Sequence, residues 1–536
     1  MNIETMTDQQ IIDYMRSKSA DNSSINKVIS KSIEDFFVKH NITIRCPHCS
    51  SPKKVRNGTN ANGITRFKCK DCGKPYMLTA NTLFEGTDYT VSEMIAAVHH
   101  VLSGNSMNHI VNNLKDEEMS KGAVWLINHK ILSVLADMPK PKLSGVIQID
   151  EKYFRETQKG SRNLVSFLNP DESRNPRYNH EGSRCGIFGA EFVNVLCAVD
   201  GNNNYWAKCV CLGPLSMAEL DDIHDFWNVA YLCSDNLEIY SEWCEKRGYK
   251  HYVEPSTYKK ERRARGYIET ENMYKTLTAE EYKKDELINR QMYKEGKYPH
   301  IENSNHKLSF DEFQVIKNKF GLGLHRVNGF HSELESFLQQ THGISSEYLE
   351  DYIGTHVFIM NYKKKHNLVS FSKHHAEEIL VEMIKHTIKY KNIPTRQELL
   401  EKNVNHLRRP SARTITNARK MMDKCRNIII EPTNYGNDGA LYEGDGEIAQ
   451  YIFNKKKFFT SLGTVRINEL CKLYRIYDRN ETKKQRIERL CNLPNAEDII
   501  FHEIYVTKYG SEEQMREAFE KLPEKRKRGR PRKNEI

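Results

Sequence analysis

The hydrophobic pattern of the chain changes along its length and predicts regions of different secondary structure. Residues 1–40 place apolar side chains at helical spacing, which predicts a short N-terminal helical segment without readable chemistry. Three further helical stretches follow at Val91–Leu102, Ser106–Leu114 and Ser120–Leu135, separated by polar turns. They predict a helix-turn-helix-like unit over 88–138, although a plain helical linker would show the same pattern.

After Pro141 the pattern changes to short runs that are apolar throughout or alternate with period two, which predicts strands. The five predicted strands are Gly145–Asp150, Phe192–Val199, Tyr205–Cys211, Val229–Cys233 and Lys250–Val253. Short turns join the first three, and helical stretches at Met217–Trp227 and Leu237–Lys246 flank the fourth. This βββαβαβ order predicts an RNase H-like domain, which we place at 144–365.

Three other segments are predicted to be helical. Residues 256–322 are rich in Lys, Glu, Arg and Tyr and predict a charged insertion in the RNase H-like domain, to which we assign no chemistry. Residues 370–430 are helical and basic, with Thr395 as a helix cap, and predict a helical DNA-binding-like domain. Residues 460–495 resemble the small helix-loop-helix SAP fold, although an ordinary helical hairpin fits equally well.

Length and charge restrict the class of protein. A chain of 536 residues exceeds what one hydrophobic core usually supports, so we expect several domains. No apolar run approaches the roughly 18 residues needed to cross a bilayer, and the first ten residues lack the features of a secretory signal. We therefore expect a cytoplasmic protein without a membrane partner. The net charge of +10 indicates nucleic acid as a partner but does not establish it.

Four of the 13 cysteines form two pairs, Cys46-Pro-His-Cys49 and Cys69-Lys-Asp-Cys72, separated by nineteen residues. This spacing is typical of two turns that each offer two thiolates to one tetrahedral Zn²⁺, and it predicts a zinc ribbon at 41–80 with structural zinc. Four unligated cysteines, or an iron site, are the alternatives. Seven basic residues in this segment could meet DNA phosphates or form a solvated rim: Lys53, Lys54, Arg56, Arg66, Lys68, Lys70 and Lys74.

Two acidic residues fall where the predicted strand order would bring them together. Asp150 is expected to close the first strand, and Asp235 directly follows the fourth. Carboxylates placed together repel each other unless they share cations, so we expect them to bind a pair of Mg²⁺ ions. Such a pair would activate an attacking oxygen at a phosphodiester. Two aspartates that merely cap turns are the alternative.

Three blocks of the sequence resemble a known family. They are Ile149-Asp150-Glu151-Lys152-Tyr153-Phe154, then Ser234-Asp235 with Tyr240 and Gly248-Tyr-Lys-His251, and finally His325-Arg-Val-Asn328-Gly-Phe-His331, which continues through Leu349 and Tyr352 to Asn361-Tyr362. With the cysteine pairs, these blocks resemble the zinc-ribbon DDE transposases of bacterial insertion sequences, group fifteen ninety-five, whose catalytic domain also looks like that of the Merlin elements. The resemblance spans roughly residues 44–365.

The resemblance implies a third metal ligand, and here the chain departs from the family. The family usually has Glu three residues after the Asn of the third block, where this chain has His331. Histidine suits Mn²⁺ better than Mg²⁺. Glu335 lies one helical turn later on the same face. We therefore expect Asp150, Asp235 and His331 to bind catalytic Mg²⁺ or Mn²⁺ with Glu335 assisting, and Asn328 to contact DNA; a merely structural His331 is the alternative.

The last segment, 523–536, resembles an AT-hook around Gly529-Arg530-Pro531. Gly and Pro would keep the backbone extended while Arg528, Arg530 and Arg532 lie along the minor groove of double-stranded DNA. A solvated basic tail is the alternative.

Together these features predict a multidomain α/β protein, with an RNase H-like catalytic domain preceded by a zinc ribbon and a helix-turn-helix and followed by small helical DNA-binding modules. The resemblance implies an enzyme, a DNA transposase that binds terminal inverted repeats and catalyses metal-dependent strand cleavage and transfer. It would be associated with the bacterial nucleoid and act as a homo-oligomer. A catalytically impaired DNA-binding regulator and a nuclease on the same fold are the alternatives.

Overall fold

The computed structural model divides the chain into two compact units, Met1–Ser411 and Ala412–Ile536. In the first unit it describes residues 7–411 apart from 19, 114–119, 162, 167–170, 172, 174–188, 224–226, 267–277, 303–306 and 342. In the second unit it describes 413, 414, 417 and most of 459–499. The AT-hook-like segment at 523–536, with Arg528, Arg530 and Arg532, lies outside the described residues.

The N-terminal helices pack against the zinc ribbon. Helices α1 (Asp8–Ser17) and α2 (Asn22–Lys39) contact each other, and the three antiparallel strands of the ribbon follow in the order β1-β2-β3. These strands are β1 (Lys54–Thr59), β2 (Thr65–Cys69) and β3 (Pro75–Met77). The buried hydroxyl of Ser30 on α2 donates to Thr65 Oγ1 at 2.9 Å, so α2 is fixed to β2 by a polar contact as well as by its apolar face.

Helices α3 (Val91–Leu102), α4 (Met107–Asn113) and α5 (Lys121–Asp137) follow the ribbon. Helix α13 (Lys373–Tyr390) packs against α3 although 270 residues separate their ends in sequence. The short helix α14 (Arg396–Leu400) begins after Thr395, whose side chain accepts the Glu398 amide N–H, the cap expected from the sequence. Within the predicted 370–430 domain, residues 412, 415, 416 and 418–430 lie outside the described residues.

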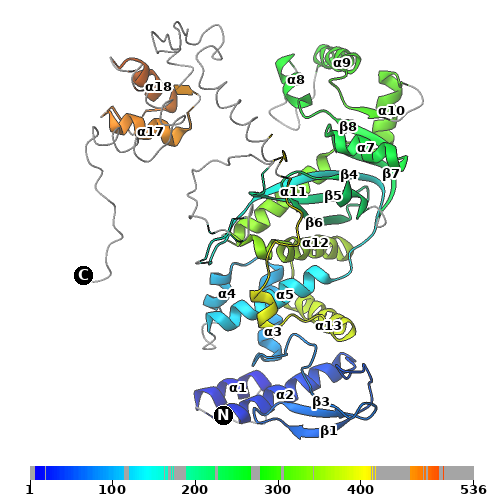
Figure 1. Ribbon diagram of the computed structural model, residues 1–536, viewed down its shortest axis with the longest axis vertical. Helices are drawn as coiled ribbons and strands as arrows, with labels where there is room; N and C mark the ends of the chain where they lie inside the picture. The colour runs from blue at the N-terminus through cyan, green and yellow to red at the C-terminus, as the bar shows by residue number, and fades with distance from the viewer. Residues whose placement is uncertain are drawn as a thin grey trace. The chain divides into compact units, whose positions relative to one another are not determined.

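A six-stranded sheet forms the centre of the first unit, in the order β6-β5-β4-β7-β8-β9 (Figure 1). Its strands are β4 (Leu143–Arg155), β5 (Phe192–Asp200), β6 (Tyr205–Leu212), β7 (Trp227–Asp235), β8 (Lys250–Glu254) and β9 (His300–Glu302). Strand β4 is central and pairs antiparallel with β5 and parallel with β7, which is itself parallel to β8. The molecule is therefore a multidomain α/β protein with an N-terminal zinc ribbon.

Three details of the sheet differ from the sequence prediction. Strand β4 does not close at Asp150 but continues to Arg155, because β5 still pairs with it as far as Phe192 opposite Arg155. Trp227 begins β7 instead of ending a helix. Strand β9 adds a sixth, antiparallel strand from within the insertion that was predicted to be helical, because three residues suffice to pair with the edge of β8.

Helices cover both faces of the sheet, and the alternation of side chains along β4 and β5 explains why. Ile147 and Ile149 belong to an apolar cluster with α6 (Met217–Asp221) and α7 (Glu238–Arg247). On the other face, Val195 and Cys197 pack in the cluster that contains α11 (His325–Gln340) and α12 (Leu349–His366). The insertion contributes α8 (Tyr258–Ala264), α9 (Ala279–Lys294) and α10 (Phe310–Phe320).

The second unit contains a pair of helices, α17 (Thr464–Leu473) and α18 (Lys483–Cys491), in the segment that resembles the SAP fold. They share a small apolar cluster that includes Ile467, Leu470, Ile487 and Leu490. Arg486 is buried between them and donates to Asn468 Oδ1 at 2.7 Å and to the Asp478 carbonyl at 2.9 Å. This charge is therefore satisfied inside the helical pair.

Candidate functional site

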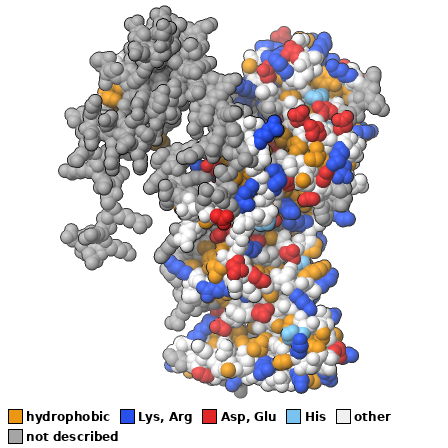
Figure 2. All heavy atoms as spheres, in the orientation of Figure 1, with side chains coloured by type: hydrophobic (Ala, Val, Ile, Leu, Met, Phe, Trp, Pro, Cys, Tyr) orange, Lys and Arg blue, Asp and Glu red, His pale blue; other side chains and the backbone are white. Residues whose placement is uncertain are grey.

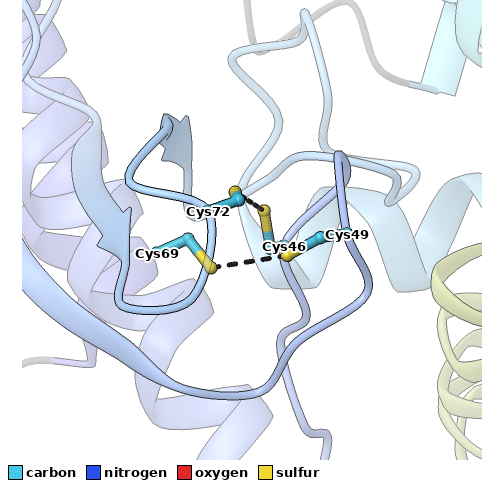
Figure 3. Close-up of side chains that lie close together, drawn as sticks. All are labelled: Cys46, Cys49, Cys69 and Cys72. Carbon is cyan, nitrogen blue, oxygen red and sulfur yellow. Dashed lines mark hydrogen bonds between the residues drawn. The ribbon is translucent and has the colours of Figure 1, made fainter.

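The four paired cysteines lie together in the ribbon. Their sulfur atoms are all within 4.8 Å of one another, with Cys46 Sγ 3.6 Å from Cys72 Sγ and Cys49 Sγ 3.5 Å from Cys69 Sγ (Figure 3). A tetrahedral Zn²⁺ with bonds of about 2.3 Å holds its sulfur ligands roughly 3.8 Å apart, so the cluster has the size of one zinc site. The expected structural zinc ligands are confirmed as such a cluster.

Each cysteine pair is built on a tight turn that the local sequence allows. Ser50 and Gly73, directly after the two pairs, adopt positive φ angles of 61° and 71°, and their amides donate to the carbonyls of Cys46 and Cys69. The backbone N–H of Cys72 lowers the pKa of the Cys69 thiol to about 7, against opposition from burial. A backbone amide thus favours the thiolate of Cys69 before any metal binds, whereas, against a backbone hydrogen bond from Ser51, burial and the neighbouring thiols raise the pKa of Cys49 to about 12.

The basic residues of the ribbon do not all remain available to a partner. Arg56 forms an ion pair with Glu34, Lys53 Nζ lies 3.5 Å from Asp71, and Lys54 lies over the Phe67 ring. Lys68, Lys70 and Lys74 are exposed. Figure 2 shows Lys and Arg interspersed with Asp and Glu over the face that it draws, so on that face no single basic surface of the described residues marks a binding site.

Asp150 and Asp235 lie side by side on the two central parallel strands. The paired positions Ile147 with Leu232 and Gln148 with Cys233 continue in register to Asp150 beside Asp235. Burial and the Asp235 carboxylate together raise the pKa of Asp150 to about 7. Burial also raises the pKa of Asp235. Two partly buried carboxylates whose charged forms are disfavoured form a place where a cation is stabilised.

Helix α11 is positioned over β4 by an amide side chain. Gln148 Oε1 accepts the backbone N–H groups of Arg326 at 2.7 Å and Val327 at 3.2 Å, in the first turn of α11. Leu324, the residue before the helix, supplies no side-chain cap. Gln148 on β4 therefore caps the N-terminus of α11 in place of a residue directly before the helix.

From this anchor, α11 and β4 run alongside each other with matching steps. Four residues of helix advance about 6.0 Å and two residues of strand about 6.6 Å. Accordingly, the backbone N–H of Val327 donates to Gln148, and His331 Nδ1 lies 3.8 Å from Asp150 Oδ2. One further step along both elements, the Glu335 carboxylate lies 2.9 Å from Lys152 Nζ.

Of the two residues expected near the third metal ligand, His331 thus lies next to Asp150. Glu335 instead forms an ion pair with Lys152 further along the strand. Burial lowers the pKa of His331 to about 4, so its imidazole is neutral and able to bind a metal at neutral pH. Its Nε2 atom is buried and has no hydrogen-bond partner among the described residues. Asn328, the predicted DNA contact, is exposed on the same helix.

The acidic site is more open than the cysteine cluster. Within the described part of the chain, only the four cysteines bring three or more potential ligand atoms within 4.8 Å of one another. The separation of 3.8 Å between His331 and Asp150 still suits two ligands of one ion, because metal bonds of about 2.1 Å allow ligand atoms roughly 3–4 Å apart. The raised carboxylate pKa values and the neutral imidazole, whose Nδ1 faces Asp150, fit a divalent cation held between β4, β7 and α11.

Sequence reasoning missed two residues that build this site, Gln148 and Lys152. Both lie on the Asp150 side of β4, at intervals of two residues, so the available signal was three consecutive polar positions on one face of an otherwise apolar strand. Glu151 on the opposite face was also passed over. Burial raises the pKa of Glu151 to about 8, with the carboxylates of Asp150 and Asp235 adding to this effect.

Comparisons with known proteins bear on the ribbon and on limited segments elsewhere. Residues 41–73 match the family model described as the InsA N-terminal domain, a zinc ribbon. A stretch of 118 residues, 22% of this chain, is 28% identical to 38% of the "Uncharacterized protein in transposable element ISH50" of Halobacterium salinarum. A stretch of 38 residues, 7% of this chain, is 42% identical to 42% of the "Insertion element iso-IS1N protein InsA" of Shigella dysenteriae.

The chain thus spans less than half the length of each of these relatives. Among the described residues, no helix combines the length and the apolar character that crossing a membrane would require. The ribbon match and the two relatives together support similarity to proteins of insertion elements.

Proposed function

We propose that this chain is the DNA transposase of an insertion sequence, of the zinc-ribbon DDE type that its motifs resemble. The observation that carries the proposal is that Asp150 and Asp235 lie on the two central parallel strands, with His331 of α11 next to Asp150. Similarity to insertion-element proteins supports the biological context. The strand order β6-β5-β4-β7-β8, with its antiparallel and parallel pairs, supports an RNase H-like catalytic domain.

The proposed chemistry follows from what these side chains can do. Asp150, Asp235 and neutral His331 would hold Mg²⁺ or Mn²⁺, which when bound activates an attacking oxygen and stabilises the leaving oxygen at a phosphodiester. Lys152 lies on the same face of β4 and remains partly exposed, so its ammonium can attract the DNA phosphate to the carboxylates. Glu335 would modulate the charge of Lys152 and assist the metal only indirectly.

The other parts of the chain would bind double-stranded DNA. The ribbon and helices α3–α5 would recognise the terminal inverted repeats, with Asn328 contacting DNA near the acidic site. The segment 370–430, the SAP-like helices and the AT-hook-like arginines Arg528, Arg530 and Arg532 would hold donor or target duplex through the backbone and the minor groove. Since two ends must be joined, the active form would be a homo-oligomer.

Strand transfer tests this proposal directly. The wild-type protein should cleave a duplex that carries the inverted repeat flanking its coding sequence and join the end to a target duplex, in Mn²⁺ more strongly than in Mg²⁺. The Asp150→Ala variant should bind the same duplex and leave it uncut. Cutting without joining would indicate a nuclease on the same fold.

A catalytically impaired DNA-binding regulator is the second candidate. The observation that favours it is the imidazole of His331 in place of a carboxylate, together with the absence of a tight three-ligand cluster among the described residues of the sheet. This function would be established if wild type binds the ends but cleaves no more than Asp150→Ala in either metal.

A further inference from the structure

A chain of buried polar side chains leads from the insertion to the strand that carries Asp235. Ser234 Oγ lies 2.8 Å from His251 Nε2, and His251 Nδ1 lies 3.0 Å from Glu302 Oε2. Ser234 and His251 are 0% exposed, whereas Glu302 is partly exposed on β9. The three residues come from the neighbouring strands β7, β8 and β9, so the chain crosses the sheet from its edge towards the centre.

The Glu302 carboxylate can only accept, so His251 Nδ1–H donates to it. In the contact of 2.8 Å between Ser234 Oγ and His251 Nε2 either atom can be the donor. The Ser234 hydroxyl also lies 2.8 Å from the carbonyl oxygen of Asp235, which can only accept. The chain of polar side chains thus ends at the backbone of Asp235.

The order serine, histidine and glutamate also occurs in hydrolases that use serine as a nucleophile, but the geometry excludes this use here. Ser234 has no access to solvent, and its Oγ lies as close to the Asp235 carbonyl oxygen as to the imidazole. A nucleophilic serine must reach a substrate and transfer its proton to the base. The chain therefore acts within the protein.

We propose that Ser234, His251 and Glu302 form a positioning relay that fixes the end of β7 and thereby holds Asp235 in place for metal binding. This inference rests on the proposed function and deepens it. Asp235 is the last residue of β7, and beyond it the chain enters α7. A strand end is held by few ladder hydrogen bonds, so a buried side-chain contact to its carbonyl has a large share in fixing the direction of the carboxylate.

The relay gives the insertion a function that its charged composition does not reveal. Glu302 is one of only three residues in β9, which pairs with β8 through His251, Tyr252 and Val253. Hydrogen bonds from His251, His300 and Ser241 hold the pKa of Glu302 well below its ordinary range, so the relay ends on a stable carboxylate. Contacts of the insertion with DNA or with a partner would reach Asp235 through this residue.

The test uses full-length zinc-loaded protein, the end-bearing duplex and Mn²⁺ as the probe. The variants are Ser234→Ala, His251→Gln and Glu302→Gln, and Asp235→Asn is the reference for loss of the ligand itself. We expect each relay variant to raise the Mn²⁺ concentration for half-maximal cleavage about tenfold to a hundredfold, the range typical of residues that orient metal ligands. The KM for DNA should change less than twofold, and excess Mn²⁺ should restore part of kcat.

Glu295→Gln is the matched control, because Glu295 lies in the same insertion and pairs with Arg265 without contacting the relay. It should leave the Mn²⁺ midpoint unchanged. Glu302→Gln is the mildest relay variant, since the amide oxygen can still accept from His251, and it should lie between wild type and His251→Gln. Thermal unfolding of every variant shows whether a loss of metal affinity occurs in folded protein.

Relay variants that unfold at the wild-type temperature and keep the wild-type Mn²⁺ midpoint would overturn the relay while leaving the proposed function intact. A relay variant that is less stable than wild type, but whose folded fraction keeps the wild-type Mn²⁺ midpoint, would overturn the relay in the same way. If Asp235→Asn itself cleaves and binds Mn²⁺ like wild type, the proposed function fails, and the relay fails with it.

Discussion

The cysteine cluster and the acidic site proposed to bind a divalent cation are built by the chain in opposite ways. The cysteines come from two turns separated by nineteen residues, and a backbone amide favours the thiolate of Cys69 before zinc binds. The acidic site takes its residues from β4, β7 and α11, and burial together with the Asp235 carboxylate raises the pKa of Asp150. One site is preorganised by local backbone geometry, whereas the other is assembled by the tertiary fold and held against electrostatic repulsion.

Because of this difference, the two sites should respond differently to the loss of one ligand. A local site loses its metal when one ligand is removed, and its own small domain unfolds. A site assembled by the fold loses its metal without unfolding, and removal of a repelling charge makes the protein more stable. The following predictions test this contrast, beginning with the change expected to have the largest effect.

Cys69→Ser should break the ribbon. With one thiolate missing, the cluster no longer holds zinc tightly, and three short strands cannot form a stable core without it. Zinc content should fall from one ion per chain to nearly none, and proteolysis should cut within 41–80. Cys491→Ser, outside the cluster, serves as the control and should keep its zinc. Full zinc retention in Cys69→Ser would falsify the four-cysteine site.

Asp150→Asn should abolish cleavage and stabilise the metal-free protein. The folded pKa near 7 exceeds the unfolded value near 4, so the folded state binds this proton more tightly and the free energy of unfolding decreases as pH rises from about 4 to 7. Asparagine removes this penalty. We expect a gain of about 2 kcal/mol at about pH 8 and none at about pH 4, after a discount for partial exposure.

Urea unfolding of metal-free protein at the two pH values measures this effect. The same pKa predicts that cleavage by wild type rises with pH through about 7, and that more Mn²⁺ moves this midpoint to lower pH, because metal and proton compete for the carboxylate. A midpoint independent of Mn²⁺ would show that Asp150 does not bind the metal.

Gln148→Met should detach the first turn of α11. The amide groups of Arg326 and Val327 lose their acceptor, at a cost of about 1–3 kcal/mol in the free energy of unfolding. Cleavage should fall about tenfold because His331 is no longer aligned with Asp150. Gln314→Met removes a hydrogen bond to Tyr298 elsewhere and should leave cleavage unchanged. Equal effects of the two substitutions would argue against the anchoring role.

His331→Glu should change the preferred metal. A carboxylate at this position favours Mg²⁺ over Mn²⁺ compared with imidazole, so the ratio of cleavage rates in Mg²⁺ and Mn²⁺ should rise about tenfold. His331→Ala should lower both rates. Rates measured at saturating DNA separate this effect from binding, and an unchanged ratio in His331→Glu would place His331 outside the metal site.

Glu335→Gln should have the smallest effect. Its carboxylate is 49% exposed and pairs with Lys152, and an exposed pair contributes little to stability. Cleavage should stay within about twofold of wild type, and the Mn²⁺ midpoint should not move. A tenfold loss would instead support the direct assisting role at the metal that the sequence spacing suggested for Glu335.

How much the sequence predicts follows the same contrast between local and assembled features. Cysteine spacing predicts the zinc cluster, and alternation along the chain predicts β4 to β8, because both signals lie within a few residues. The end of β4, strand β9 and the contact of Gln148 with α11 depend on pairing across long sequence separations, which no local pattern records. The helical period correctly placed Glu335 on the same face as His331, but it could not show that Glu335 forms an ion pair with Lys152.

The matching advance of α11 and β4 has a consequence for how such proteins diversify. Since the first turn of the helix is fixed by Gln148, the Cα atom at position 331 keeps its place whatever side chain it carries. One substitution can therefore exchange imidazole for carboxylate, and with it the cation that the proposed site favours, without redesign of the scaffold. One inserted residue between Val327 and His331 would rotate the His331 side chain by about 100° around the helix axis. The imidazole would then no longer face Asp150.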